Sequence, residues 1–556
     1  MKKILLSVLS ITAFISAVVA NGEENVSRCE AEIDATRGGV ELWNAMKMMN
    51  TWNCFNSGFD SAHNRRDSDR YEFVEWFELM QCTGGNDSRD LFKNPNDMKV
   101  KDDYDFTKII ASIRGLLNLG AKPYIKLGNV PKKFVGHFDG GEFSINIYPP
   151  EDWDGHNRYI AAFMRALVDA FGVDEVRSWR YALLTEADNA GWFFARSKNL
   201  KETFDAYCRL YKETYLTLRS ILGEKFLYGT HVLGASYDTW KLPRWTAEQF
   251  CKWCAAEKLP LDIIATSHYD VVGYPVGKRL GLLEDTAMGD WMKAAKKYGF
   301  KNVIWGVDEG RIIVGRRGRD RKDLLARAHG DAYQAAWDAR ITKNMYDLGV
   351  DYFAAWQYFT DDAKAGFAGP AHIAYYVARE AAKFKGMKRA DFKVANSQFV
   401  DKFEEFDGVA SVSADGRSFR VMAYHFNNKT KYSRLAEAKF AVKTALPPLT
   451  RCRVRKITID NDSNWYDDWD ADRVKYGIKD SDFSWSPDCP CVLNYTGLVK
   501  QEHRELFKKL LPKYLKKSVL VTEERVEYVD ERGIVELDAE FKGNAVVFFD
   551  IQTSAK

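Results

Sequence analysis

Residues 179–189 read WRYALLTEADN, and residues 302–310 read NVIWGVDEG. Each stretch opens with a short apolar run typical of a buried strand, and each then reaches an acidic residue, Glu186 in the first and Glu309 in the second. Both side chains are therefore expected to project from the carboxyl ends of their strands, which is the active-site end of a β/α barrel. Two carboxylates that meet at such a site are the groups that glycoside hydrolysis requires.

The same pattern extends over residues 45–385, where strand-like runs alternate with longer amphipathic runs at helical spacing. Strands that alternate with helices predict a parallel sheet, and eight strands can be counted, so we expect a (β/α)8 TIM barrel. A doubly wound sheet is the alternative, but no glycine-rich phosphate loop follows the first strand. The expected strands are 48–55, 73–82, 122–127, 179–184, 226–232, 263–267, 302–307 and 352–359, and the expected helices are 106–119, 157–171, 200–222, 247–258, 283–297, 324–348 and 373–384.

After about residue 386 the pattern changes to short strands separated by turn residues, which predicts a C-terminal β-sandwich over residues 386–556. Residues 21–44 form an N-terminal segment, and its strand-like part, 27–34, could join that sandwich. A helical run over 501–514 interrupts the strand pattern. The expected strands include 418–426, 438–445, 451–459, 519–528 and 544–551.

The N-terminus has the pattern of a targeting segment. Lys2 and Lys3 precede an apolar run that extends from Ile4 to Ala20 and ends in small residues. This predicts a signal peptide over residues 1–20, cleaved after Ala20, and hence a secreted or periplasmic protein. A membrane anchor is the alternative, and no later segment is apolar enough to span a bilayer. Without residues 1–20 the chain has 79 basic and 78 acidic residues, so its charge gives no reason to expect nucleic acid as a partner.

The nine cysteines are an odd number, so at least one is unpaired or bonded to another molecule. Cys251 and Cys254 form a CxxC, but no second CxxC or histidine pair completes a zinc site. The helical pattern around them favours two buried cysteines. The sequence therefore predicts neither a metal nor a cofactor.

Several segments, in order from about residue 100 to the end, carry a likeness to one family. They are DYDFTKIIASIRGLLNLGAKPYIKLGNVPKKF, DEVRSWRYALLTEADN, LDIIATSHYD, NVIWGVDEG, VDYFAAWQYFTDD, VMAYHFNN and ITIDNDSNWYDDW. Through them the chain resembles glycoside hydrolase family 39, which contains β-xylosidases and α-L-iduronidases. The resemblance implies an oligo- or polysaccharide substrate and a retaining mechanism, with Glu186 as acid/base and Glu309 as nucleophile. The environments of the two should keep the acid protonated and the nucleophile ionised.

The chain departs from the family at the acid/base strand. The family usually has Asn-Glu-Pro there, with Trp before it, whereas this chain has Leu184-Thr185-Glu186-Ala187. The Asn would bond the sugar 2-hydroxyl, and Thr185 is shorter, so it would reach that hydroxyl only partly or through water. The histidine-containing second strand of the family is replaced by FELMQCTGG. We infer a divergent member with a different sugar in its central subsite, the alternative being a chain that has lost activity.

Further substrate-binding candidates lie near the expected strand ends. Asn189 follows Glu186. His268 and Tyr269 follow the sixth strand, where the resemblance implies a His-Tyr-type pair that touches Glu309 or a sugar hydroxyl; a polar pair at the barrel rim is the alternative. Trp356 could form the floor of the central sugar subsite, because an aromatic face packs on the apolar face of a pyranose; core packing is the alternative.

A basic segment, RIIVGRRGRDRK, follows Glu309 directly. Arg316 and Arg317 lie in it, and arginine suits carboxylate and sulfate oxygens. An acidic glycan is therefore one expected substrate class. The alternative is a solvated loop whose arginines pair with Asp320 and Asp323.

The leading hypothesis is a secreted retaining glycoside hydrolase. A non-catalytic glycan-binding protein that kept the fold is the second hypothesis, and Thr185 is its best support. A barrel enzyme of other chemistry, such as a lyase, is the third. Release of reducing sugar separates the first from the second, and an absorbing unsaturated product would indicate the third.

Overall fold

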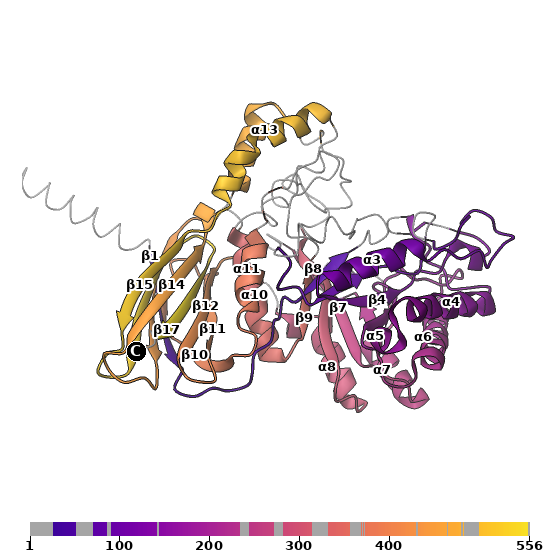
Figure 1. Ribbon diagram of the computed structural model, residues 1–556, viewed down its shortest axis with the longest axis horizontal. Coiled ribbons are helices and arrows are strands. Elements are labelled where there is room, and N and C mark those ends of the chain that lie inside the picture. Colours follow the sequence, from indigo (N-terminus) through magenta and orange to yellow (C-terminus); the bar gives the residue numbers. More distant parts are fainter. Residues whose placement is uncertain are drawn as a thin grey trace, which may run out of the picture.

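The computed structural model describes residues 26–51, 70–85, 90–138, 140–141, 144–233, 244–271, 282–313, 332–355, 369, 371, 373–429, 432–463, 465–479, 482 and 500–553. These residues form two β-sheets, a closed eight-stranded barrel and a nine-stranded sheet. Figure 1 shows the nine-stranded sheet on the left and the barrel on the right, with helices α10 (Ala332–Leu348) and α11 (Ile373–Ala382) between them.

The barrel confirms the predicted order of parallel strands. Each strand pairs in parallel with the next along the chain, and the last, β9, pairs with the first, β2, to close the ring. The carboxyl ends of all eight strands therefore meet at one mouth. The strands are β2 (Met48–Thr51), β3 (Trp76–Leu79), β4 (Lys122–Leu127), β5 (Arg180–Leu183), β6 (Leu227–Val232), β7 (Ile263–Val271), β8 (Ile304–Ile313) and β9 (Tyr352–Ala355).

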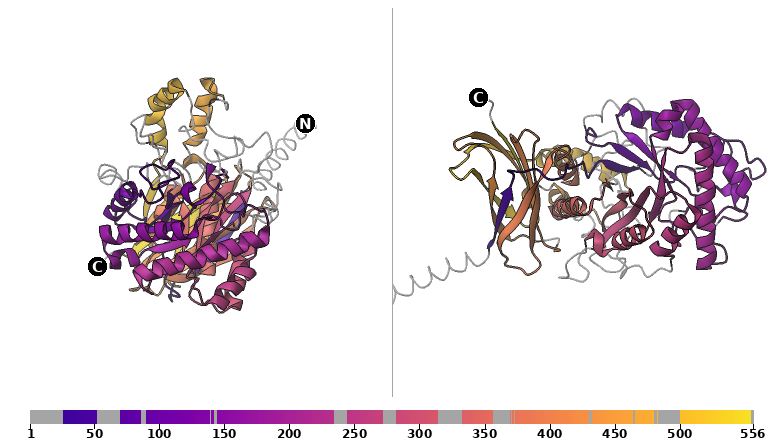
Figure 2. Two further views of the ribbon diagram at one scale, coloured as in Figure 1. Left: turned by 90° about the vertical axis from the view of Figure 1, so that its right-hand side faces the viewer. Right: turned by 90° about the horizontal axis from the view of Figure 1, so that it is seen from below.

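Helices cover the outside of the barrel strands (Figure 2). Their starts are fixed by local capping: Asp152 accepts the N–H of Gly155 at the start of α4, and Thr246 and Gln249 form a capping box at the start of α7. Besides α10 and α11, the helices are α3 (Thr107–Asn118), α4 (Trp153–Phe171), α5 (Val173–Arg177), α6 (Leu200–Leu222), α7 (Ala247–Glu257) and α8 (Ala287–Lys297), with short 3-10 turns η1 (Lys132–Phe134) and η3 (Leu283–Asp285).

The nine-stranded sheet folds over into two layers. Its order is β15-β14-β17-β12-β11-β10-β1-β13-β16. Strand β10 pairs with β11 in its first part and with β1 in its second, so the sheet changes layer along this strand. The layers meet through aromatic contacts such as Phe440–Phe549, with ring centroids 5.4 Å apart. The strands are β1 (Val26–Asp34), β10 (Lys388–Gln398), β11 (Glu405–Val412), β12 (Ser418–Phe426), β13 (Leu435–Lys443), β14 (Arg451–Ile459), β15 (Thr522–Tyr528), β16 (Ile534–Lys542) and β17 (Ala545–Thr553).

Helix α10 joins the two sheets. The ring of Tyr333 packs on Phe426 of β12 at 5.3 Å, and Arg340 Nε lies 3.1 Å from both carboxylate oxygens of Glu405 in β11. Most of this helix is buried, because one side covers the barrel and the other covers the sheet. The barrel and the C-terminal sheet thus share one apolar core.

The C-terminal region contains elements that the sequence pattern did not predict. Strands β10, β11 and β16 were not singled out by the sequence pattern, and residues 466–475, expected within the sandwich pattern, form helix α12 (Tyr466–Lys475) beside η4 (Asn461–Ser463). This helix is rich in aspartate and weakly amphipathic, but Trp469 packs on Phe507 of α13 (Gln501–Lys517), with ring centroids 4.9 Å apart. Tertiary contact between the two helices therefore outweighs their weak local pattern.

The cysteines of the CxxC are both buried in α7 and form no disulfide. Burial raises the pKa of the Cys251 thiol to about 12, so it is not a thiolate at neutral pH. In the described part of the chain no helix has the length and apolar character to cross a membrane.

Candidate active site

Glu186 lies just past the carboxyl end of β5, in a sharply turned segment. Leu184 and Glu186 both have positive φ angles, 59° and 43°, which are uncommon outside glycine and often occur at functional sites. The turn is held by the N–H of Ala187, which donates to the carbonyl of His231 at 2.9 Å. Asn189 Nδ2 then donates to Glu186 Oε2 at 2.7 Å, so this side-chain amide orients the carboxylate.

Glu309 lies in β8, and a β-bulge determines its direction. Strands β7 and β8 pair in register up to Thr266 and Val307, but the next residue of β7, Ser267, lies opposite Glu309. Asp308 is therefore an extra residue in β8, and the alternation of side chains is broken there. As a result, the side chains of the consecutive residues Asp308 and Glu309 both contact neighbouring barrel strands. Asp308 bonds Lys126, and Glu309 bonds Tyr269.

The side chains of Tyr269 and His268 point in different directions from β7. The hydroxyl of Tyr269 donates to Glu309 Oε2 at 2.9 Å, whereas the ring of His268 stacks on Trp337 of α10, with centroids 6.0 Å apart. Successive residues of a strand point to opposite faces, which explains the separation. Of the two alternatives for this pair, the structure gives the contact with Glu309 to Tyr269 and packs His268 against a barrel helix.

The two glutamates influence one another electrostatically. Burial raises the pKa of Glu309 well above its usual range, and the charge of Glu186 raises it further, while the Tyr269 hydroxyl and the Lys126 ammonium lower it. Glu186 and Glu309 are each only 4% exposed, so placing a negative charge on both carboxyl groups at once is energetically unfavourable. The sequence-based expectation of a lowered pKa at the nucleophile is therefore wrong for the ligand-free protein, because burial outweighs the groups that favour the charge.

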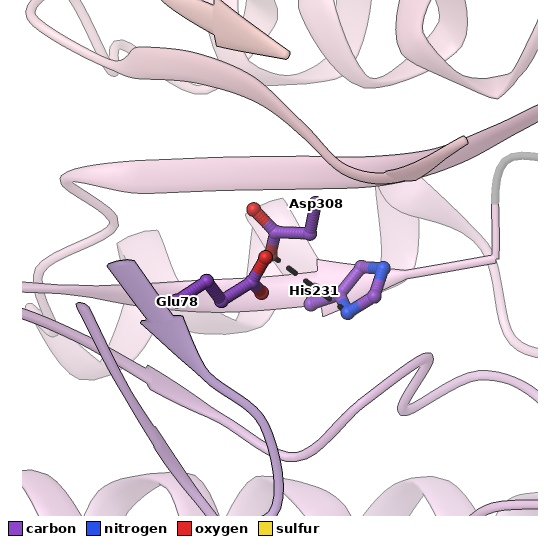
Figure 3. Close-up of side chains that lie close together, drawn as sticks. All are labelled: Glu78, His231 and Asp308. Carbon is purple, nitrogen blue, oxygen red and sulfur yellow. Dashed lines mark ion pairs between the residues drawn. The ribbon is translucent and has the colours of Figure 1, made fainter. Parts of the chain in front are cut away.

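A polar layer lies inside the barrel next to Glu309. Asp308 accepts hydrogen bonds from Lys126 and, at 2.5 Å, from the Tyr352 hydroxyl. Lys126 Nζ is also 3.2 Å from Glu78 Oε1. Figure 3 shows Glu78, His231 and Asp308 pointing toward one another across the barrel. All of these side chains are fully withdrawn from solvent.

The donor types in this layer raise the question of a metal ion. One ligand atom from each of Glu78, His231 and Asp308 lies within 4.8 Å of the others. However, the ammonium of Lys126 bonds two of these three side chains directly. The layer thus contains its own cation, and a metal bound there would have to displace it.

Asp188 is a third buried carboxylate close to Glu186. Burial raises its pKa to about 7, although the N–H of Leu233, which donates to Asp188 Oδ1 at 2.6 Å, and the charge of Arg244 lower it. Asp188 also lines a cleft of about 450 Å³ between α7 and α8, together with Arg244, Trp245 and Trp291. Near neutral pH this group therefore exchanges a proton beside the candidate acid/base.

Asp188→Asn is expected to be more stable than the wild type at neutral pH and not at pH 4. The folded pKa of about 7 lies above the ordinary value of 3.8, so ionisation favours the unfolded chain as pH rises from about 4 to about 7. Asn keeps an acceptor for Leu233 and cannot ionise, so the difference should grow over this window by up to about 4 kcal/mol. Thermal unfolding of both proteins between pH 4 and pH 8 measures it. A difference that does not change with pH would contradict the assignment.

Of the remaining substrate-binding candidates, one is buried and the others lie outside the residues that the structure describes. Thr185 is fully buried, and its hydroxyl has no hydrogen-bond partner in the described part of the chain. Trp356, Arg316 and Arg317 lie outside the described residues. The functional candidates that the sequence pattern missed are Lys126 and Glu78; a signal for them existed, since each is a charge within an apolar strand run.

Comparison with known proteins relates the barrel to one family. Residues 70–297 match the model of glycosyl hydrolases family 39, a segment that includes Glu186 and ends before Glu309. A β-xylosidase from Geobacillus stearothermophilus is 25% identical over 178 residues, which cover 31% of this chain and 32% of that protein. The match thus spans about a third of the length of this curated relative.

Solved structures show the same fold over nearly the whole chain. A monomeric β-xylosidase from Caulobacter crescentus CB15 has a TM-score of 0.62 at 16% identity, over 95% of this chain and 100% of that one. A bacterial orthologue of human α-L-iduronidase has a TM-score of 0.64 at 12% identity, over 95% and 84%. The fold extends the likeness beyond the matched segment, and the sequence match over residues 70–297 relates this part of the barrel to glycosyl hydrolases family 39.

Proposed function

We propose that this protein is a secreted retaining glycoside hydrolase that cleaves an O-glycosidic bond in an oligo- or polysaccharide, with Glu186 as acid/base and Glu309 as nucleophile. The observation that carries the proposal is the state of Glu309. Its Oε2 accepts the Tyr269 hydroxyl, whereas its Oε1 has no hydrogen-bond partner in the described part of the chain. A carboxylate held by one oxygen and open at the other is suited to attack an anomeric carbon.

In the first step Glu309 Oε1 bonds the anomeric carbon while Glu186 gives its proton to the leaving oxygen, which departs with the bonding electron pair. In the second step Glu186 takes a proton from water, the water oxygen bonds the anomeric carbon, and Glu309 leaves as a carboxylate. The raised pKa of Glu309 bears on this cycle, because burial and the charge of Glu186 favour a single negative charge on the two carboxyl groups before the sugar binds. Secretion is supported by the signal-like pattern of residues 1–20.

Retention of anomeric configuration is the expected outcome of such a double displacement. Because relatives of the barrel segment are named β-xylosidases, aryl β-D-xylosides are the first substrates to test. Proton NMR in the first minutes of turnover identifies the first product anomer before mutarotation. An inverted product would remove Glu309 as nucleophile and would point to a water activated by another carboxylate, such as Asp188 or Asp308.

An acidic substrate is the further proposal for this site, and it rests on the arginines that follow Glu309 in the sequence. Arg316→Ala and Arg317→Ala are expected to raise KM at least about fivefold for a uronate-bearing glycoside and to change it little for a neutral one, since a charged hydrogen bond is worth about 1.5–3 kcal/mol. Parallel kinetics on the two glycosides measure the effect. Equal changes on both substrates, or none, would count against an acidic glycan.

A non-catalytic glycan-binding protein is the second candidate function, and the burial of Thr185 favours it. The family's asparagine contact to the sugar 2-hydroxyl has no exposed counterpart at this position. The candidates separate on a panel of glycans: binding measured by calorimetry without release of reducing sugar would support the second, and release of reducing sugar would support the first.

A further inference from the structure

Lys126 is a fully buried cation on the interior of the barrel. It lies in β4, in the run KPYIKL, and its side chain has no exposed surface. Its ammonium bonds Asp308 Oδ2, lies 3.2 Å from Glu78 Oε1, and sits 4.8 Å from the centre of the Tyr124 ring. A buried ammonium is costly unless it is paired, so its partners determine what it does.

The groups that face this cation come from most of the barrel strands. Asn50 of β2 donates to the carbonyl of Asp308 at 3.0 Å, and His231 of β6 has Nδ1 3.8 Å from Asp308 Oδ2. Burial, with Lys126 nearby, lowers the pKa of His231 well below its usual range, so this ring is neutral. The titratable and charged groups around Lys126 are Glu78, Tyr124, His231, Asp308, Glu309 and Tyr352, with Glu186 beside Glu309.

The charges in this layer balance through one pair. Burial raises the pKa of Glu78 well above its usual range, and the charge of Asp308 raises it further, which favours the protonated form of Glu78. The positive charge of Lys126 is then matched by Asp308, the carboxylate that it contacts most closely. This pair is neutral as a whole, as a buried pair should be.

Asp308 is the extra residue of the bulge and the chain neighbour of Glu309. Its position is fixed by Lys126, by the Tyr352 hydroxyl and by the bond from Asn50 to its carbonyl. If its charge were not matched, Asp308 would oppose ionisation of Glu309, because like charges at close range cannot both form.

We propose that Lys126 is a positioning residue for Glu309: by pairing with Asp308 it holds the bulge in place and cancels the charge that would otherwise stop Glu309 from ionising. The inference rests on the proposed role of Glu309 and deepens it. In this role Lys126 does not touch the substrate, since its side chain is fully buried.

Four variants test the proposal through the pH dependence of kcat/KM on an aryl glycoside. Lys126→Met should move the acidic limb to higher pH, so that kcat/KM falls at least about tenfold more at pH 5 than at pH 8. Asp308→Asn should move the limb to lower pH. The double variant Lys126→Met with Asp308→Asn should return it toward the wild type, because no charge remains to be cancelled. Lys133→Met, which removes another buried lysine from its pair with the partly exposed Asp103, should leave the limb in place.

Opposite shifts from the two single variants separate charge from structural damage, which would lower kcat/KM at every pH. If Lys126→Met alone does not fold, the double variant can still be measured, because the double variant has no unpaired buried charge at this pair. A limb that stays displaced in the double variant would overturn the proposal, since Lys126 would then act by its own charge. A limb that does not move in either single variant would overturn it as well.

Thermal unfolding separates failure of this inference from failure of the proposed function. The raised pKa of Glu309 makes the fold less stable as pH rises above about 4.5 through the folded pKa, and Glu309→Gln removes that loss. The melting-temperature gap between each background and its Glu309→Gln partner should therefore keep widening to higher pH in Lys126→Met than in the wild type. If no glycoside is cleaved but this widening is seen, the proposed function fails and the Lys126 assignment stands; the same pH dependence in both backgrounds would remove the assignment.

Discussion

Glu309→Gln is expected to lower turnover of the natural substrate to less than about a hundredth of the wild-type rate, since loss of an activated nucleophile costs at least that much. The amide cannot attack the anomeric carbon, although it can still accept the Tyr269 hydroxyl, so the loss should appear in kcat more than in KM. Steady-state kinetics on an aryl glycoside test the assignment. Activity above about a tenth of the wild-type rate would contradict it.

The same substitution should stabilise the fold, which distinguishes a chemical defect from unfolding. Burial raises the pKa of Glu309, so the wild type loses stability as pH rises above about 4.5 and the amide does not. The melting temperature at pH 7 should rise by roughly 2 °C or more. Glu202→Gln, on the exposed first turn of α6, is a matched control that should change neither activity nor stability.

Some element bounds were predictable from the sequence because local pattern determines them, whereas β7 and β8 extend to Val271 and Ile313, beyond the predicted ends at 267 and 307, so Glu309 lies within β8. Helix α6 begins and ends at the predicted residues, and Glu186 follows β5 as expected from the apolar run before it. In both cases the signal is contained in fewer than about 25 neighbouring residues, through period and polarity alone.

The direction of side chains within β8 was not predictable in the same way. The bulge at Asp308 depends on how β8 pairs with β7, and a shift of one residue reverses every side chain that follows. Alternation alone would place Asp308 and Glu309 on opposite faces, whereas the structure turns both toward neighbouring strands of the barrel. The position of Lys126 between Glu78 and Asp308 depends on the same closure of distant strands.

Pairs of neighbouring residues show the same limit. His268 and Tyr269 are adjacent in the sequence and both carry a hydrogen-bonding group, and the sequence left open which of them contacts Glu309. The pleat of β7 decides in favour of Tyr269 and leaves His268 against Trp337. A motif thus predicts which segment reaches the site, and the register of the sheet decides which side chain enters it.

Glu186→Gln is expected to have an effect that depends on the leaving group. For a sugar leaving group, which needs a proton, kcat/KM should fall at least about a hundredfold, because Gln cannot donate one. For a dinitrophenyl glycoside, which leaves without a proton, kcat/KM should change less than about threefold.

The second half of the reaction completes this test. Without Glu186 no base activates water, so the glycosyl-enzyme should accumulate and appear as an initial burst of dinitrophenol. Azide needs no base, and it should restore turnover and give a glycosyl azide of retained configuration. The carboxylate removed here is the one that Asn189 orients, so Asn189→Ala should produce a milder loss with the same dependence on the leaving group. Equal losses on both glycosides, with no burst and no azide product, would mean that Glu186 shapes the loop after β5 and does not carry the proton.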